Sequence, residues 1–327
     1  MGRAALPRGH QHPAARQRRP THAGSGDMSN STNEKPARPV CAITGTGGYV
    51  GGCLKNYLAA RGREILELTR RPAPGARAVA FHLGADISPQ TLAGVGVLVH
   101  CAYDFQPLRP EEIRAVNVEG TRKLFQAARA AEVGRIVCLS SISAYDGCRS
   151  LYGKAKLEIE KIALGRGALV IRPGLVYGSA PGGMFGKLIA QVRKSSVIPL
   201  IGDGSQIQFL VHHEDLAAFI EKFTAGKTEM APRILTAAHD RPWPFRQLLS
   251  EIARGLDKQV KFVPLPWWLV WAGLKSVETC GLRLDFRSDS VVSLMHQDPK
   301  PDFSPNAAAG LICRPFAVKT LKLEASR

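Results

Sequence analysis

Short apolar runs rich in β-branched residues alternate with segments of helical periodicity from Val40 onward. Strands and helices that alternate in this way build a parallel sheet with helices on both faces. The pattern therefore predicts an α/β fold with a Rossmann-type doubly wound parallel sheet. The expected strands are Val40–Thr44, Glu64–Thr69, Ala78–His82, Val97–Cys101, Arg135–Ser140 and Ala168–Arg172. The expected helices between them are about Val50–Ala60, Ile113–Ala131 and Tyr152–Leu164.

A glycine-rich turn follows the first expected strand, in the segment Thr44-Gly45-Thr46-Gly47-Gly48-Tyr49-Val50-Gly51. Gly45 permits a tight turn, Gly48 lets the backbone approach a pyrophosphate, and Gly51 lets the next helix sit close to the strand. The amides at the start of that helix then face the anion. A glycine-rich loop without a ligand is the alternative, but strand, turn and helix stand in the order that dinucleotide binding needs. We therefore expect a dinucleotide site.

The end of the second expected strand bears on the choice between NADP and NAD. An acidic residue there usually holds the ribose diol of NAD, but Thr69 occupies the place and Arg70 and Arg71 follow. Because a guanidinium matches the oxygens of a 2′-phosphate, we expect NADP, with NAD as the alternative. The two arginines can also simply solvate a loop. Asp86-Ile87 is a candidate for the adenine amino group, although Asp86 is also an ordinary turn residue.

Tyr152 and Lys156 stand one helical turn apart on one face of an expected helix. An ammonium a few Å from a phenol favours the phenolate, which can exchange a proton with a hydroxyl carbon while hydride moves to or from a nicotinamide. The fifth expected strand ends in Ser140-Ser141, where a hydroxyl can hold the reacting oxygen.

Further motifs stand in order over about residues 40 to 250. They are Val99-His100-Cys101-Ala102, Asn117-Val118-Glu119-Gly120-Thr121, Arg172–Gly178, Ile198–Gly204, Phe209–His212 and Glu214–Ala217. With the glycine turn, the serine pair and the Tyr152/Lys156 spacing, they resemble the extended short-chain dehydrogenase/reductases, the NAD-dependent epimerase/dehydratase family. The C-terminal segments Leu294–Pro301 and Arg314-Pro315-Phe316 resemble divergent members.

The resemblance implies Ser141, Tyr152 and Lys156 as the catalytic triad, with Lys156 also holding the nicotinamide ribose. Counting back from Ala144-Tyr145 selects Ser141 over Ser140. Tyr145 is a poor rival base, since Arg149 stands four residues later. The cofactor contacts that the chain then offers are Gly45, Gly48, Tyr49, Val50, Gly51, Arg70, Arg71, Asp86, Ile87, Ala102, Tyr103, Asn117, Pro173 and Val176.

Within that set, the resemblance gives Asn117 the task of shaping the active-site helix and has a loop at Pro173–Val176 cover the nicotinamide. It also implies a homodimer through helices at Asn117–Ala131 and Tyr152–Leu164. The expected function is an NAD(P)(H)-dependent oxidoreductase or epimerase acting on a secondary alcohol or ketone, first of all a nucleotide-sugar 4-keto reductase or epimerase. The alternatives are a reductase of a small non-sugar carbonyl compound and a non-catalytic NADPH-binding structural or regulatory subunit.

Three departures from the family pattern weaken the nucleotide-sugar interpretation. The segment Asp146–Leu151 before the tyrosine is short. Gln208 stands where the family usually has a phosphate-binding arginine. No Asp-Glu pair follows Ser141, as it does in the dehydratases of the family, so dehydratase ranks last.

The pattern loosens after Gly178, which predicts a second, smaller lobe that binds substrate. We expect residues 39–180 in the Rossmann domain with 205–220 returning to it, and residues 181–204 and 221–327 in the second lobe. A helix is expected at Met184–Arg193 and a strand at Gln206–His212.

The first 38 residues predict a disordered basic tail, since they lack apolar runs and are rich in Pro, Gly, Ser and His. A start at Met28 is the favoured interpretation, and an organelle transit peptide is the alternative. The tail carries part of the net charge of +17. We expect the remaining charge to suit an anionic dinucleotide, because it shows no clustered basic helix of the kind that binds nucleic acid.

The seven cysteines are scattered without a CxxC pair, which predicts a reduced, cytoplasmic location. No window holds 18 consecutive apolar residues, so no membrane span is expected. Trp267, Trp268 and Trp271 at helical spacing are expected to pack in the core or a substrate cleft, with an interfacial membrane anchor as the alternative. His212-His213 beside Glu214-Asp215 is expected at a strand-to-helix junction, and no metal site is expected.

Overall fold

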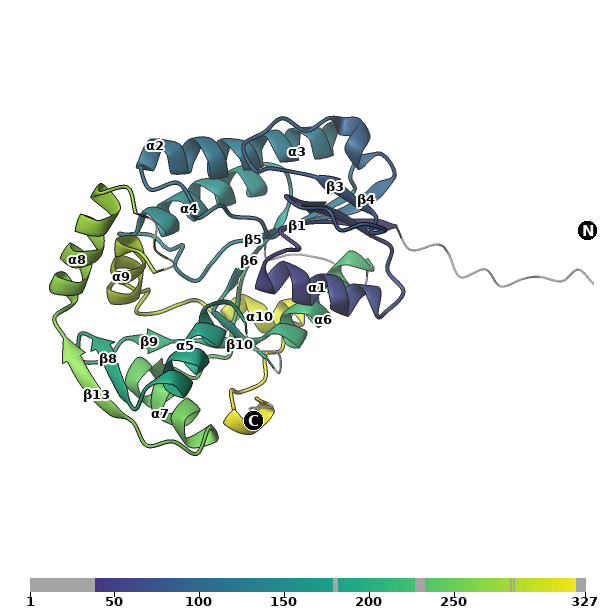
Figure 1. Ribbon diagram of the computed structural model, residues 1–327. Coiled ribbons are helices and arrows are strands. Elements are labelled where there is room, and N and C mark those ends of the chain that lie inside the picture. The colour runs from purple at the N-terminus through teal and green to yellow at the C-terminus, as the bar shows by residue number, and fades with distance from the viewer. Residues whose placement is uncertain (1–38, 179–181, 227–232, 283, 285, 322–327) are drawn as a thin grey trace, which may run out of the picture. The chain divides into compact units, whose positions relative to one another are not determined.

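A seven-stranded, entirely parallel sheet forms the centre of the computed structural model (Figure 1). The structure describes residues 39–178, 182–226, 233–282, 284 and 286–321, so the predictions for the tail before residue 39 lie outside it. The strand order is β11-β6-β5-β4-β1-β2-β3. This is the doubly wound order, in which the first three strands are added on one side of β1 and the later strands on its other side. The expected fold class is confirmed.

The strands and helices of this part follow the expected ranges closely. The strands of the sheet are β1 Val40–Thr44, β2 Ile65–Thr69, β3 Ala78–Ala80, β4 Val95–His100, β5 Arg135–Leu139, β6 Leu169–Pro173 and β11 Ile234–Ala237. The helices that cover it are α1 Tyr49–Ala59, η1 Pro89–Leu92, α2 Pro110–Ile113, η2 Arg114–Glu119, α3 Gly120–Ala130, α4 Leu151–Leu164 and α6 His213–Thr224.

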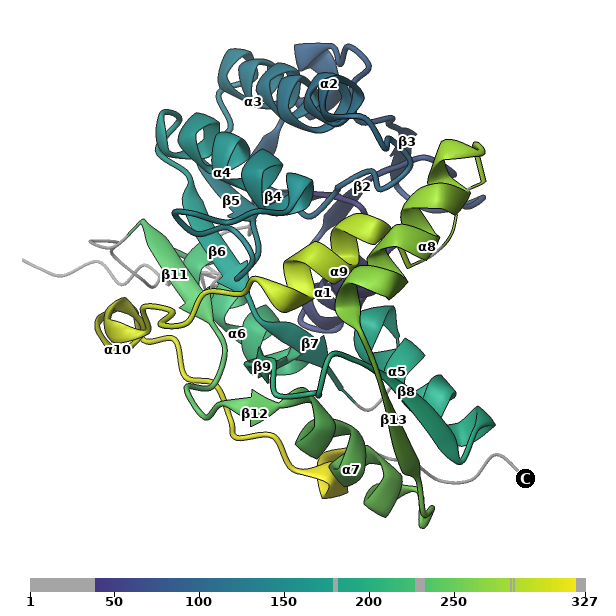
Figure 2. The same ribbon diagram turned by 90° about the vertical axis from the view of Figure 1, so that its left-hand side faces the viewer.

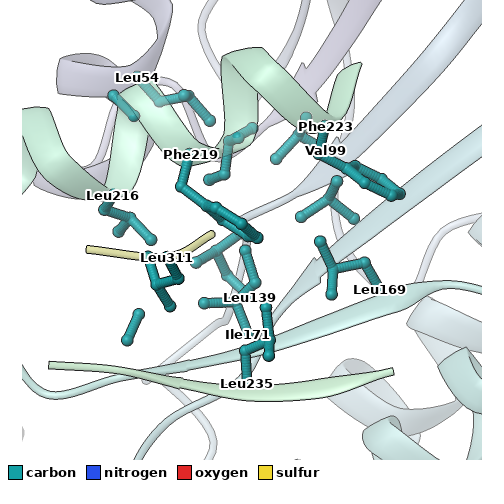
Figure 3. Packing of buried hydrophobic residues seen from close by; sticks show 14 of the residues in the cluster. Leu54, Val99, Leu139, Leu169, Ile171, Leu216, Phe219, Phe223, Leu235 and Leu311 are labelled. Atoms are coloured by element: carbon teal, nitrogen blue, oxygen red, sulfur yellow. The ribbon is translucent and has the colours of Figure 1, made fainter. Parts of the chain in front are cut away.

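Alternate residues of each central strand enter two separate apolar clusters, one on each face of the sheet. On β1, Ile43 packs towards α1 and α6, while Ala42 packs towards α3 and α4. Figure 3 shows the first cluster, where Phe219 and Phe223 of α6 lie over strand residues such as Val99. Because both faces are covered, the strands read as continuous apolar runs in the sequence.

A smaller set of elements builds the second lobe around its own cluster of buried side chains. Its strands are β7 Leu175–Tyr177, β8 Val197–Ile201, β9 Ile207–Gln208, β10 Leu210–His212, β12 Trp243–Pro244 and β13 Lys261–Leu265, paired as β10-β7, β12-β9 and β13-β8. Its helices are α5 Gly183–Lys194, α7 Phe245–Gly255, α8 Trp267–Thr279, α9 Ser288–Met295 and η3 Val318–Thr320, and the short helix α10 Ser304–Ala309 follows α9 in the chain. Its core includes Tyr177, Phe185, Trp243 and Phe316.

Three expectations about elements need correction. Residues 221–327 do not all belong to the second lobe, because β11 pairs with β6 at the edge of the central sheet and α10 packs on it. The strand expected at Gln206–His212 is split, since its first part pairs with β12 and its second with β7. The helix expected at Ile113–Ala131 is interrupted by the π-helical η2.

Helix α4 is fixed to the sheet by a buried ion pair. Glu160 accepts hydrogen bonds from Arg172 Nε at 2.8 Å and from Nη2 at 2.6 Å. Its Oε1 also accepts the hydroxyl of Ser140 at 2.5 Å. This bidentate pair raises the pKa of Arg172 and ties α4 to β5 and β6 at the ends of these strands.

A chain of neutral hydrogen bonds runs behind the strand ends. The Thr44 hydroxyl accepts the amides of Cys101 and Ala102, both at 3.0 Å, and lies 2.8 Å from Nδ1 of His100. His100 Nε2 lies 2.9 Å from the Thr121 hydroxyl, which donates to the carbonyl of Asn117. Because the Thr121 hydroxyl donates its proton to the Asn117 carbonyl, it must accept from Nε2 of His100. Nδ1 of His100 then accepts the hydroxyl proton of Thr44. The imidazole is therefore neutral, and burial with the nearby Lys156 lowers its pKa to about 3.

This lowered pKa predicts acid sensitivity. An unfolded histidine has a pKa of about 6.5. Between about pH 6.5 and pH 3, His100 is therefore protonated in the unfolded chain but neutral in the folded chain. The contribution of neutral His100 to the free energy of unfolding is fully present above about pH 6.5. It is lost as the pH falls, and the loss is about 2 kcal/mol at pH 5. His100→Gln keeps an acceptor and a donor but does not titrate. We expect its free energy of unfolding, measured in urea at pH 7.5 and pH 5, to fall by about 2 kcal/mol less than that of the wild type. An equal fall, or the same change in the exposed-histidine variant His82→Gln, contradicts the assignment.

Candidate active site

The glycine turn between β1 and α1 is built from close backbone contacts. Gly45 has φ +73°, and a Cβ there would lie 2.9 Å from the amide nitrogen of Ala102. A Cβ on Gly51 would lie 2.3 Å from the carbonyl oxygen of Gly45. The first contact brings the turn against the end of β4, and the second brings α1 against the turn. Both positions therefore require glycine.

The same turn fits the pyrophosphate of a dinucleotide. Gly48 is the N-cap of α1 and contributes no side chain, so no side chain caps the amides of the first turn, which includes Tyr49 and Val50. The hydroxyl of Thr46 is buried at the turn with no hydrogen-bond partner in the described part of the chain. Free amides at a helix N-terminus and an unpartnered hydroxyl suit an anion.

The residues expected to hold the adenosine end lie in different surroundings. A Cβ on Gly47 would lie 3.8 Å from the Thr69 hydroxyl, so the end of β2 adjoins the turn. Arg70 and Arg71 follow it as exposed side chains, and neither makes an ion pair within the described residues. Asp86 is paired with Lys123 at 2.8 Å, while the neighbouring Ile87 packs against the apolar cluster under α3.

Tyr152 and Lys156 come together on α4, as their spacing predicts. Lys156 is 3% exposed, and its ammonium donates to the carbonyl of Leu139 at the end of β5 with a length of 2.8 Å. Its Nζ lies 5.9 Å from the centre of the Tyr152 ring. The lysine is therefore held between the strand end and the phenol.

The surroundings of the two serines distinguish them. Ser140 is buried, and its hydroxyl is engaged by Glu160. Ser141 is half-buried, and within the described residues its hydroxyl accepts the amide of Ser143 at 3.1 Å. The hydroxyl of the rival Tyr145 donates to the carbonyl of His296 at 2.8 Å. Ser141 is thus the better placed of the two serines to reach a ligand.

An aromatic wall, formed by Tyr103 and Phe105, stands against Tyr152. The Tyr103 ring meets the Tyr152 ring edge-on at 4.9 Å between centres, and Phe105 stacks on it at 5.5 Å. Phe105 is 53% exposed, while burial raises the pKa of Tyr103. Tyr103 was expected near the cofactor, but Phe105 was not predicted, because a phenylalanine after a strand carries no spacing signal.

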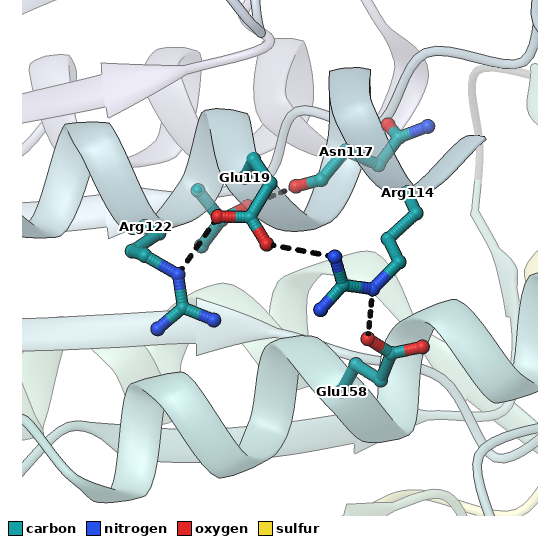
Figure 4. Close-up of polar contacts among 6 residues, drawn as sticks. Arg114, Asn117, Glu119, Arg122 and Glu158 are labelled. Atoms are coloured by element: carbon teal, nitrogen blue, oxygen red, sulfur yellow. Dashed lines mark hydrogen bonds and ion pairs between the residues drawn. The ribbon is translucent and has the colours of Figure 1, made fainter. Parts of the chain in front are cut away.

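Asn117 sits fully buried in η2 and holds the segment that carries the aromatic wall. Its Oδ1 accepts the amide of Asp104 at 2.7 Å, and its Nδ2 donates to the Asp104 carbonyl at 3.0 Å. Figure 4 shows Arg114 of η2 bridging Glu119 and Glu158, the latter on α4. Asn117 thus positions the chain after β4, and its expected role in shaping the active-site helix stays a prediction.

The structure corrects the loop expected at Pro173–Val176. Pro173 is the last residue of β6, and Val176 lies within β7, opposite Val211 of β10. The Val176 side chain belongs to the apolar cluster under α1 and α6. The backbone between them bends at Gly174, where a Cβ would lie 2.2 Å from the Phe209 carbonyl.

The remaining expectations meet mixed outcomes. His212 ends β10 and His213 begins α6, so the strand-to-helix junction is confirmed, and the described residues hold no group suited to a metal ion.

Trp267 lies against His296 and Trp271 lines a cavity of about 190 Å³, but core packing is wrong for Trp268, which is 59% exposed. Among the described helices, none is both long and apolar enough to cross a membrane.

Comparisons with known proteins agree with this geometry. The sequence model of the NAD dependent epimerase/dehydratase family matches residues 41–235. The sterol-4-alpha-carboxylate 3-dehydrogenase, decarboxylating, of Bos taurus is 25% identical over 281 residues, 76% of this chain and 78% of that protein. The ceramide reductase of Caulobacter vibrioides is 32% identical over 197 residues, 57% of this chain and 61% of that protein. Further relatives are named for nucleotide sugars.

The solved structures show the same fold. MoeE5 in complex with UDP-glucuronic acid and NAD superposes with a TM-score of 0.66 at 20% identity, covering 86% of this chain and 97% of that one. The family match spans more than half of the chain and includes the turn, the serine pair and the Tyr152/Lys156 helix. The chain therefore belongs to the NAD-dependent epimerase/dehydratase family and is an enzyme of the extended short-chain dehydrogenase/reductase type.

Proposed function

We propose that this enzyme interconverts a ketone and a secondary alcohol, with Tyr152 exchanging the proton at the reacting oxygen. The observation that carries this proposal is the placement of Tyr152 and Lys156 on one face of α4, beside the end of β5 where Ser141 stands. In the direction of reduction, a bound nicotinamide cofactor would be the source of the hydride for the carbonyl carbon. Tyr152 gives its hydroxyl proton to the carbonyl oxygen, and the resulting phenolate is favoured by the Lys156 ammonium. The Ser141 hydroxyl donates a hydrogen bond to the same oxygen.

An apolar substrate fits the aromatic wall best. A molecule that reaches Tyr152 meets the exposed face of Phe105, which offers apolar contact and no hydrogen bond. At the place of the family's phosphate-binding arginine, Gln208 donates to the neighbouring carbonyl of Ile207. Both observations favour a lipid-like ketone or alcohol over the nucleotide sugar that the motifs alone suggest. A nucleotide-sugar 4-keto reductase or epimerase remains the second candidate, supported by the motif resemblance.

NADP is the proposed cofactor, supported by Arg70 and Arg71 at the end of β2. Both side chains are exposed beside the glycine turn and make no ion pair within the described residues, so they are free to meet a 2′-phosphate. The scattered, free cysteines support a reduced compartment such as the cytoplasm.

Replacement of the tyrosine tests the proposed chemistry. We expect Tyr152→Phe to lower kcat by about a hundredfold or more, because the proton donor is lost while the ring and its stacking remain. The dissociation constant of NADPH, measured by fluorescence, is expected to change less than twofold. The assay uses NADPH with a panel of a 3-ketosteroid, a long-chain ketone and a nucleotide 4-keto sugar. Tyr57→Phe, in the last part of α1 and outside the segment around Tyr152, is the matched control. A fully active Tyr152→Phe enzyme contradicts the proposal. A wild type that binds NADPH but turns over none of the panel also contradicts it, because that is the behaviour of a non-catalytic subunit.

The cofactor preference has its own test. A charge-assisted hydrogen bond contributes about 1.5–3 kcal/mol, so we expect the double variant Arg70→Ala/Arg71→Ala to weaken NADPH binding by about tenfold or more. Binding of NADH is expected to stay within about twofold, because NADH lacks the 2′-phosphate. Arg129→Ala, at the end of α3, controls for a general loss of positive charge. Tighter binding of NADH than NADPH by the wild type would refute the preference.

A homodimer through α3 and α4 is proposed from the family resemblance. Both helices cover the same face of the sheet. We expect light scattering to give twice the 35.4 kDa of one chain. A monomer at micromolar concentration would contradict this arrangement.

A further inference from the structure

Helix α9 of the second lobe is hydrogen-bonded, near both ends of the helix, to the chain between β5 and the first turn of α4. At its start, Asp289 contacts the N-terminus of α4, which carries Tyr152. Towards its other end, Ser293 donates to the Ser143 hydroxyl at 3.2 Å, and the carbonyl of His296 accepts the Tyr145 hydroxyl. Figure 2 shows α9 between α8 and the beginning of α4.

The carboxylate of Asp289 completes the capping of α4. One oxygen accepts the amide of Leu151 at 2.7 Å, and the other accepts the amide of Tyr152 at 3.0 Å. The side chain of the N-cap residue Ser150 accepts the amide of Gly153. The first amides of a helix have no partner within it, so without Asp289 the turn that carries Tyr152 is held by a single capping bond.

Arg287, two residues before Asp289, is bonded to the backbone of the segment that carries the aromatic wall. Arg287 is 8% exposed as a residue, and its Nη1 donates to the carbonyls of Phe105 at 3.0 Å and Pro107 at 3.1 Å. The Phe105 ring then stacks on Tyr152. Glu278 of α8 accepts the amide and hydroxyl of Ser288 at 2.7 and 2.6 Å, which fixes the residue between the two.

We propose that Arg287 and Asp289 are positioning residues for the reaction, with Asp289 fixing the proton-transferring Tyr152 and Arg287 fixing the wall against which substrate packs. This inference rests on the proposed role of Tyr152. The second lobe thereby does more than cover a substrate, since it determines where the phenol of the first lobe stands.

The physical reason lies in the geometry that proton and hydride transfer require. Tyr152 sits in the first turn of α4, where a helix frays most readily, whereas Lys156 is a full turn further in. A displacement of the phenol by about 1 Å can cost up to about a hundredfold in rate. The turn for the dinucleotide lies between β1 and α1, whereas the carboxylate of Asp289 is bonded to the start of α4.

Two substitutions therefore have different kinetic signatures. We expect Asp289→Ala to lower kcat by about ten- to a hundredfold, with KM for the ketone and the dissociation constant of NADPH changed less than twofold. Asp289→Asn keeps one acceptor oxygen and is expected to fall between the wild type and Asp289→Ala. Arg287→Met, which keeps much of the apolar stem but removes the Nη1 atom that donates to both carbonyls, is expected to raise KM for the ketone severalfold with a smaller change in kcat.

The matched control is Asp302→Ala. Asp302 accepts the amide of Ser304 at 2.9 Å and its hydroxyl at 2.7 Å at the start of α10, a helix that packs on β11 and carries none of the residues around Tyr152. A purely structural role would give Asp289→Ala and Asp302→Ala the same kinetic constants at the same folded fraction. That result overturns the proposal, as does a loss of NADPH binding in Asp289→Ala.

Hydrogen exchange of the NADPH-bound protein separates this inference from the proposed function. We expect the amides of Leu151 and Tyr152 to exchange faster in Asp289→Ala, while those of Ser304 do not change. Unchanged exchange at α4 overturns the inference whether or not any ketone is turned over. An inactive wild type with faster exchange in Asp289→Ala contradicts the proposed function and, with it, the kinetic role of Asp289.

Discussion

The position of α4 depends on the buried carboxylate of Glu160. This charge is removed from water and is compensated by Arg172 on β6 and by the Ser140 hydroxyl. Removing one partner of such a pair leaves an uncompensated charge at a cost of about 3–5 kcal/mol, so the geometry of the pair is strictly maintained. Lys156, one turn earlier on the same helix, donates to the carbonyl of Leu139 at the end of β5, next to the anchored Ser140.

From this anchor the site extends along the ends of the parallel strands. The glycine turn after β1 contacts Ala102 after β4, and the neutral network of Thr44 and His100 links both to η2. Asn117 in η2 then holds the segment of the aromatic wall. Each link is a short contact or hydrogen bond between neighbouring elements. The cofactor turn, the wall and the catalytic helix therefore form one connected framework at the edge where doubly wound folds bind ligands.

The sequence was sufficient for features that depend on local pattern. Apolar periodicity gave the strands and helices of the central sheet, the glycine spacing gave the turn, and the i, i+4 spacing placed Tyr152 beside Lys156. It was insufficient where a partner lies far away in the chain. Asp289 is 138 residues from Leu151, and β11 joins the sheet from a region that reads as part of the other lobe. The exposure of Trp268 also depends on which elements cover α8, which a helical spacing does not contain.

Hydride transfer to a carbonyl carbon, coupled to proton transfer from Tyr152, is the central claim about this enzyme. The most direct measurement uses NADPH deuterated at C4 of the nicotinamide, on the transferred face, with a ketone from the panel, and analyses the alcohol by mass spectrometry. The predicted result is one deuterium at the carbinol carbon with the wild type and little labelled alcohol with Tyr152→Phe. Alcohol formed without deuterium, or formed equally by both enzymes, would contradict the account.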